Sequence, residues 1–235
     1  MRRLFAAVAL VAVGATGCWQ STLEAATHHK DAVVTVEPIT VNQNPNLKVA
    51  VEAVLSDPNA TVVVVSVTNE DPKRTAVWVP ISVKLTDAAG KVVASNIAGG
   101  NDETLTHFPS LPPDSTAYYV DDQFPAGIGA TGATVKLGGQ LQQLAQPLPS
   151  ITVSGVKVSE QAGLVQFTGT VTNTSKVAQP VLIVQAIARK GAKIVAAGTS
   201  VVRDLAAGAT ASFLGFFIGS PKGAKVQVIA PATAA

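Results

Sequence analysis

The chain has 235 residues, of which 47% are hydrophobic, 14% charged and 5% aromatic. Abundant β-branched residues and a formal net charge of only +2 exclude an intrinsically disordered protein. Arg2 and Arg3 fall in a segment that we expect to be removed, which leaves the mature chain nearly neutral. Because no basic run with interleaved aromatic residues remains, we expect no nucleic-acid partner.

Residues 1–17 have the pattern of an export signal. A positive start at Arg2 and Arg3 precedes an apolar run over residues 4–13, which is too short to span a bilayer. Small residues at Ala15 and Gly17, followed by a cysteine, resemble the lipobox of bacterial lipoproteins. That motif more often has leucine where this chain has Ala15. The resemblance implies that the cysteine becomes the lipidated first residue of the mature protein.

Cys18 is the only cysteine, so it cannot form an internal disulfide. Lipidation would use this thiol, and two acyl chains on one cysteine suffice for stable anchoring. We therefore expect the protein on the extracytoplasmic face of the cell membrane, with the membrane as its partner through lipidated Cys18. The alternative is ordinary secretion, with cleavage at the same bond and no lipid.

Residues 18–30 predict a tether, because they lack the alternation of a strand. His28 and His29 lie in it, but two adjacent histidines do not make a metal site. We expect no metal and no cofactor there.

From residue 31 onward, short segments rich in valine alternate with turns of Gly, Pro, Asn and Asp, and no convincing helix appears. This pattern predicts an all-β fold of antiparallel β-sandwiches. We place a first sandwich domain at residues 31–137, a linker at 138–149 and a second sandwich domain at 150–235.

The two predicted domains contain similar segments in the same order. Residues 61–69 and 165–173 are both strand-like and both end in Val-Thr-Asn. The other matched segments are 91–94 with 193–196, 111–114 with 205–208, 116–120 with 210–214, and 132–137 with 223–228. Because the matches keep the same order and differ in length only in loops, they indicate an internal duplication. We expect two tandem Ig-like antiparallel sandwiches.

Several of these segments resemble the FxLyD-type domain of bacterial exported proteins. The carrying segments are Val-Lys-Leu-Thr-Asp at 83–87 and the Val-Thr-Asn ending at 171–173. The second copy departs from the pattern, since Ala-Ile-Ala-Arg at 186–189 lacks the aspartate. Over residues 48–137 and 151–229, the resemblance implies an Ig-like sandwich at the cell surface and no catalytic residue.

The sequence offers little catalytic chemistry. His107 is the only histidine of the two predicted sandwiches; it falls in a polar loop predicted over residues 99–110 and has no counterpart in the second copy. No G-x-S-x-G motif and no phosphate-binding loop accompany it. We therefore expect that the protein is not an enzyme.

Carboxylates of the first copy are candidates for calcium binding. We expect them at loops or strand ends, and they are Asp102, Glu103, Asp114, Asp121 and Asp122. Clustered oxygen ligands at loop tips can hold this ion, although no Asp-x-Asp-x-Asp-Gly spacing is present. Calcium binding therefore stays open at this point.

Three aromatic residues are candidate contact residues. In the predicted strand over residues 77–86, Trp78 falls among the outward side chains, where it can contact a partner or be covered by a neighbouring loop. Phe216 and Phe217 belong to a run, 213–218, whose large side chains cannot all point inward in a regular strand. Either a bulge at Gly215 brings more of them inward, or they form an exposed patch.

These observations favour a non-catalytic binding or adaptor module with a protein or cell-envelope partner. A structural or envelope-assembly accessory protein is the alternative, and it would have a flat surface without a groove. A secreted hydrolase is a third reading, which would need converging histidine, serine or carboxylate groups in a deep pocket.

Overall fold

The computed structural model describes residues 41–97 and 103–233. The predicted signal, Cys18 and the predicted tether lie outside these residues. The described part of the chain is nearly all antiparallel β-structure, and its one helical element is the short 3₁₀ helix η1 (Glu103–Thr106). None of the described helical structure could cross a membrane. The predicted all-β sandwich fold is confirmed.

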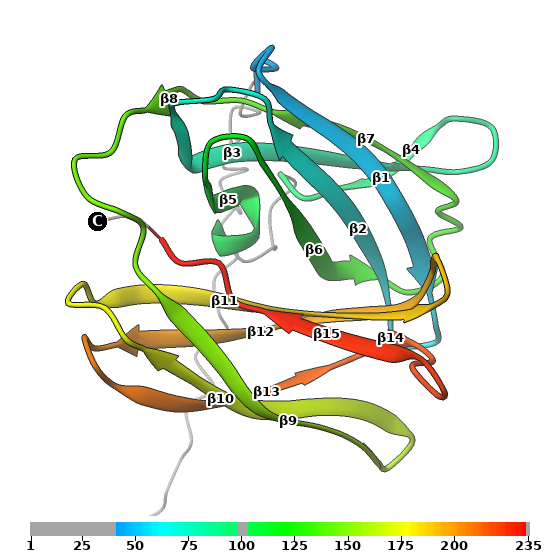
Figure 1. The fold of residues 1–235 in the computed structure, drawn as a ribbon. Coiled ribbons are helices and arrows are strands. Elements are labelled where there is room, and N and C mark those ends of the chain that lie inside the picture. The colour runs from blue at the N-terminus through cyan, green and yellow to red at the C-terminus, as the bar shows by residue number, and fades with distance from the viewer. Residues whose placement is uncertain (1–40, 98–102, 234–235) are drawn as a thin grey trace, which may run out of the picture. The chain divides into compact units, whose positions relative to one another are not determined.

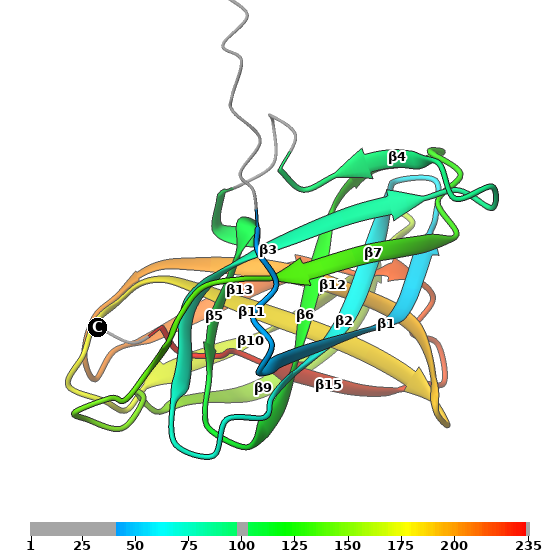
Figure 2. The same cartoon turned by 90° about the horizontal axis from the view of Figure 1, so that it is seen from above.

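The first sandwich packs two sheets face to face (Figure 1). One sheet has the order β1 (Leu47–Ser56), β2 (Ala60–Asn69), β6 (Ser115–Pro125). The other is built around β3 (Thr75–Thr86), which pairs with β4 (Val92–Ser95), β5 (His107–Leu111), β7 (Gly132–Leu137) and β8 (Leu141–Gln142). Figure 2 shows β3 between β4 and β7.

The second sandwich repeats this plan. One sheet has the order β13 (Thr210–Phe216), β10 (Leu164–Asn173), β9 (Ile151–Gln161). The other has the order β14 (Ile218–Gly219), β12 (Lys193–Leu205), β11 (Gln179–Lys190), β15 (Lys225–Ile229). The continuous strand β12 pairs along β11 as the two shorter strands β4 and β5 pair along β3.

The polar loop predicted over residues 99–110 is shorter than expected. Residues 107–111 form β5 instead, and four of these five residues are buried. They belong to a strand because Phe108 and Leu111 pack in the first core, where backbone groups need the ladder hydrogen bonds that β3 provides.

The two strand-ending asparagines perform the same structural task in both sandwiches. Asn69 and Asn173 are fully buried, and each side-chain amide donates to three backbone carbonyls of the turns that follow. The accepting carbonyls are those of Arg74, Leu111 and Pro112 for Asn69, and of Val177, Leu205 and Ala206 for Asn173, at 2.7–3.4 Å. The asparagine therefore fastens two loops to the end of one strand in each sandwich.

The turn at residues 111–114 and its match at 205–208 also agree in backbone geometry. Asp114 has φ +51° and Gly208 has φ +72°, so each turn uses the left-handed conformation at the same position. Aspartate is among the few non-glycine residues that adopt it readily.

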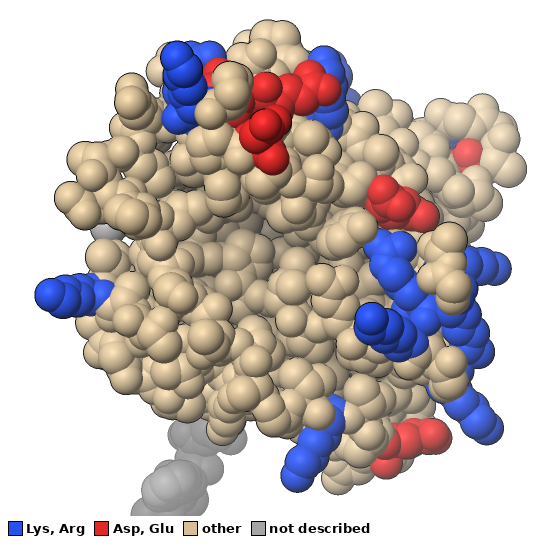
Figure 3. Space-filling model, viewed as in Figure 1, with Lys and Arg blue, Asp and Glu red and all other residues tan. Residues whose placement is uncertain are grey.

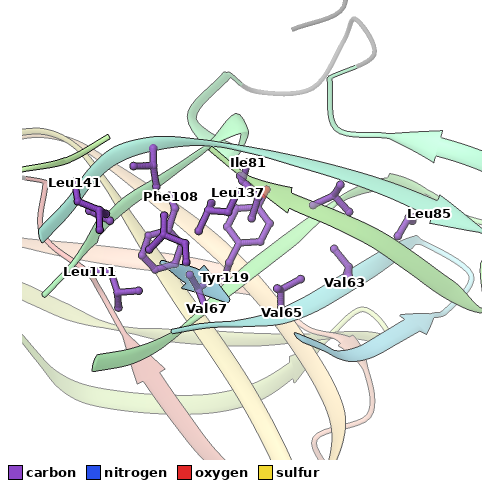
Figure 4. Close-up of a cluster of buried hydrophobic side chains, with 14 of the residues drawn as sticks. Val63, Val65, Val67, Ile81, Leu85, Phe108, Leu111, Tyr119, Leu137 and Leu141 are labelled. Atoms are coloured by element: carbon purple, nitrogen blue, oxygen red, sulfur yellow. The ribbon is translucent and has the colours of Figure 1, made fainter. Parts of the chain in front are cut away.

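Strand β2 is buried on both faces, which explains its continuous run of valines. Val63, Val65 and Val67 point into the first core with Ile81 and Phe108 (Figure 4). The opposite face of the strand carries Val62 and Val64, which belong to a second cluster.

That second cluster joins the two sandwiches. Val62, Val64 and Val120 of the first sandwich share it with residues of the second, namely Ile187, Ile194, Ala197 and Ile218. The described residues accordingly belong to one compact unit. The predicted linker also contributes to packing, because Leu141 in β8 is part of the first core.

Candidate binding site

A groove opens at one edge of the second sandwich, between the edge strands β9 and β15. Its volume is about 470 Å³. β9 pairs only with β10, and β15 pairs only with β11 among the described strands. The lining residues are Val158, Ser159, Glu160, Val165, Ser220, Pro221, Lys222, Gly223, Ala224 and Val226.

The apolar wall of this groove is the margin of the second core. Val165 and Val226 lie partly buried against that core, from β10 and β15 respectively. Val158 on β9 pairs with the fully buried Phe167, yet it is 43% exposed. Val158 therefore faces the core side of its sheet but is only partly covered there.

The matching edge of the first sandwich is covered by its own chain. The loop over residues 126–131 precedes β7 and packs Ile128 and Ala130 against the first core. The loop over residues 220–224 precedes β15; Ala224 packs against the second core and Pro221 is buried, but Lys222 and Gly223 are exposed. The second loop therefore lacks a large aliphatic side chain corresponding to Ile128, although it keeps the smaller Pro221 and Ala224.

The free edge of β7 is also capped where that of β15 is not. The backbone N–H of Asn44 donates to the carbonyl of Leu137 at 2.9 Å, and the Leu137 N–H donates to Oε1 of Gln43 at 3.0 Å. Asn44 Nδ2 donates to the carbonyl of Gly139 at 2.9 Å. In the second sandwich, no described segment makes the equivalent bonds to β15.

The outer face of β15 is basic. Arg189 and Lys225 are directly opposed on β11 and β15, so their side chains share the face away from the second core. A second cavity of about 720 Å³ lies beside them, and it is lined by Arg189, Gly191, Lys225, Val226, Gln227 and Val228. The Arg189 guanidinium lies 5.0 Å from the centre of the Tyr118 ring, and its buried Nη2 has no hydrogen-bond partner.

More positive charge surrounds this end of the second sandwich. Figure 3 shows Lys and Arg side chains gathered over the ends of β11, β12 and β15. The exposed lysines of this region are Lys190, Lys193, Lys222 and Lys225. The edge strand β15 thus lies between an apolar groove on its inner face and a basic cavity on its outer face.

Trp78 lies on the outer face of β3, as the alternation of that strand predicts. It is 39% exposed and stacks on His107 of β5, with ring centroids 5.1 Å apart and planes 5° from parallel. Its φ of +46° is unusual for a bulky residue. His107 therefore supports an exposed aromatic ring and does not lie in the polar loop where the sequence placed it.

Phe216 and Phe217 point in opposite directions. The register of β13 with β10 is continuous from Thr210 to Phe216, so no bulge occurs at Gly215. Phe216 is 44% exposed beside exposed Leu214, whereas Phe217 is only 5% exposed. The alternation of β13 continues to Phe217, whose N–H donates to the Val165 carbonyl, so its side chain faces the second core. Of the predicted pair, only Phe216 is available for contact.

The carboxylates considered for calcium are not gathered in one site. Glu103 is in η1 and Asp114 is in a turn, while Asp121 and Asp122 lie inside β6 and not at a loop. Asp102 lies outside the described residues. Among the described residues, no group of three potential metal ligands occurs.

Asp121 is instead part of a buried polar network in the first sandwich. The Tyr119 hydroxyl donates to Asp121 Oδ2 at 3.2 Å and contacts the carbonyl of Leu105, while Gln123 N–H donates to Oδ1 at 3.1 Å. Asn96 Nδ2 also donates to the Tyr119 oxygen at 3.4 Å. Burial raises the pKa of Asp121 to about 7. This network is enclosed in the core and opens to no described cavity.

Asp122 lies on the opposite face of β6 from Asp121, and its carboxylate bonds to the second sandwich. Its carboxylate accepts from the Thr199 N–H at 2.6 Å and from the Thr199 hydroxyl at 2.7 Å. Burial raises the pKa of Asp122, and the Thr199 bonds oppose this effect. Asp57 adds a similar contact by accepting from the Gly219 N–H at 3.1 Å. These two carboxylates are therefore explained by packing between the sandwiches.

Compared with known proteins, the chain matches no protein-family model and no curated protein. The resemblances to bacterial lipoproteins and to FxLyD-type domains therefore stay predictions.

Sequence reasoning missed the groove and the basic cavity. The alternating valines of β9 and β15 were visible in the sequence, but they are typical of ordinary core residues. The available signal was a difference between the copies, namely the absence of a counterpart to Ile128 before the second copy of the last strand.

Proposed function

We propose that the protein is a lipid-anchored, extracytoplasmic, non-catalytic binding or adaptor module. The export pattern and Cys18 support the anchoring. The groove beside β15 supports the binding role, since Ile128 of the first copy packs against its core and the second copy has no large aliphatic side chain in the corresponding loop. A spacer would gain nothing from leaving apolar core residues exposed in one copy and covering them in the other.

The anchor is tested by intact mass and membrane partitioning of the native protein against Cys18→Ala. We expect a diacylglyceryl mass on the wild type, and we expect the variant to lose it and become soluble. If both proteins partition alike and carry no lipid, the chain is simply secreted.

The binding role is tested by photocrosslinking in cells. A crosslinking amino acid replaces Ser159, which is exposed at the groove, or Glu52, which is exposed on the matching strand β1. We expect one discrete crosslinked species at residue 159 and none at residue 52. If neither position yields a species, and a probe at Trp78 also fails, the structural accessory role is the better explanation.

A further inference from the structure

We infer that the free edge of β15 binds an extended segment of another protein in which aliphatic and acidic residues alternate. The inference rests on the proposed binding function and specifies its partner. It predicts binding by strand addition, with main-chain hydrogen bonds to β15 and side chains entering the cavities on both of its faces.

The first step is the edge itself. A strand at the margin of a sheet presents unpaired N–H and C=O groups that can pair with another chain. The edge of β7 in the first sandwich is capped through Gln43 and Asn44, but β15 has no such cap among the described residues. In the described part of the chain, the second copy therefore has an uncapped edge strand, whereas the first copy is capped at Leu137, the end of β7.

The second step is the alternation of side chains. Successive residues of a strand point to opposite faces, so every second side chain of an added strand would extend over the core side of β15. There it meets the groove lined by Val158, Val165 and Val226. In the first copy, Ile128 of the loop before β7 packs against the core, which shows that an aliphatic side chain can be accommodated at such a margin.

The third step is charge. The remaining side chains of an added strand would extend over the outer face, beside Arg189 and Lys225. No acidic residue lines that cavity. On the groove side the charged residues Glu160 and Lys222 offset one another. Charge complementarity therefore selects acidic side chains for the outer face only.

A second copy of this chain is a poorer occupant. Pairing β15 with β15 around a two-fold axis would place Lys225 and Arg189 of both copies on one face, where like charges repel. An acidic, aliphatic partner removes this repulsion and covers the same apolar surface.

The test measures fluorescence anisotropy of labelled peptides with the full chain. The probe peptide alternates valine and glutamate. One control peptide has the same composition in two blocks, and another carries N-methyl groups on alternate residues to remove main-chain donors. We expect saturable binding of the alternating peptide that weakens with added salt, and at least tenfold weaker binding of both controls.

Variants locate the site. Val158→Lys fills the groove, and Lys225→Glu reverses the charge of the outer face; we expect each to weaken binding about tenfold or more. Lys136→Glu makes the same charge change on β7 of the first sandwich and should leave binding within about twofold. Lys225→Glu should also bind a peptide of alternating valine and lysine better than the wild type does, a gain that misfolding cannot produce.

Several results would overturn the inference. They are equal binding of the block peptide, no effect of N-methylation, equal losses for Lys136→Glu and Lys225→Glu, or no binding of the alternating peptide at all. Concentration-dependent dimers that Val158→Lys disrupts would assign the groove to a second copy. A crosslink from residue 159 to the same chain would assign it to an internal segment.

The outcomes also separate this inference from the proposed function. A crosslinked partner at residue 159 without peptide binding refutes the alternating strand and leaves the adaptor role intact. If the alternating peptide binds but no partner is crosslinked in cells, the adaptor role is refuted, and the inference that β15 can bind an alternating aliphatic and acidic strand stands.

Discussion

Asn69 and Asn173 show how one side chain can hold the end of a strand in both copies. Each is buried, and each amide donates to three backbone carbonyls. A buried polar group that loses its partner costs about 1–3 kcal/mol, so the loss of several bonds together is severe.

We therefore predict that Asn173→Ala lowers the free energy of unfolding by about 2–4 kcal/mol, as measured by urea denaturation. Thr172→Ala is the matched control, because its hydroxyl bonds to that of Thr210 on an exposed face; it should cost less than about 1 kcal/mol. Equal losses in the two variants would contradict the role assigned to Asn173.

The raised pKa of Asp121 should make the stability of the folded protein depend on pH. Its pKa is raised by burial to about 7 in the folded protein, against roughly 4 in an unfolded chain. The folded state thus binds more protons between these values, and its stability falls as the pH rises from about 4 to about 7, by up to about 1.4 kcal/mol per pH unit for one group.

Urea denaturation at pH 5 and pH 8 tests this dependence. The wild type should be more stable at pH 5, and Asp121→Asn should reduce the difference. Asp122 contributes with the same sign in both proteins, because burial raises its pKa too. Asp71 does not contribute in this range, since hydrogen bonds from Arg74 and Lys73 lower its pKa to about 2. If the stability difference between pH 5 and pH 8 is as large in Asp121→Asn as in the wild type, Asp121 is not the group responsible for it.

At the scale of the element, β13 carries a glycine for a packing reason. Gly215 lies opposite Phe167 on β10, and a Cβ there would collide with that ring and lie 2.5 Å from the carbonyl oxygen of Thr199. The absence of a side chain at residue 215 lets the Phe167 ring fill the second core, where Phe213 and Phe217 flank it.

Gly215→Ala should consequently lower the free energy of unfolding by about 1–3 kcal/mol or more, because the core must move to admit one methyl group. Leu214→Ala on the exposed face of the same strand should cost less than about 1 kcal/mol. Thermal denaturation followed by circular dichroism compares the two, and a neutral Gly215→Ala would mean that the ring is free to shift.

At the scale of the whole molecule, the two sandwiches are coupled by a shared apolar cluster and by polar bonds. Val62 and Val64 pack against Ile187, and Asp122 bonds to Thr199. Because separating the sandwiches would expose this cluster to water, they should unfold together.

We predict coincident denaturation curves for the protein with Trp19→Phe, in which Trp78 is the only tryptophan and its fluorescence reports the first sandwich, when fluorescence is compared with far-UV circular dichroism. Ile187→Asp should separate the two curves, since it places a charge in the shared cluster. Val92→Asp at an exposed position of β4 should keep them together. Non-coincident curves in the Trp19→Phe protein would show that the sandwiches are independent.

The features that the sequence by itself determined are those that depend on local interactions. The period-two alternation of valine and polar residues specifies strands, glycine and aspartate specify turns, and the recurrence of Val-Thr-Asn reveals the duplication, all within short stretches of chain. The outward direction of Trp78 followed from the same alternation.

Only the tertiary structure decided which faces are covered, because burial depends on segments distant in sequence. It placed Asp121 and Asp122 inside β6, brought residues 107–111 into a strand beside β3, and showed that no bulge at Gly215 brings Phe216 inward. It also showed that β2 is buried on both sides. The groove beside β15 was least predictable, since it exists where a covering segment is missing, and a missing contact leaves no local pattern in the residues that line it.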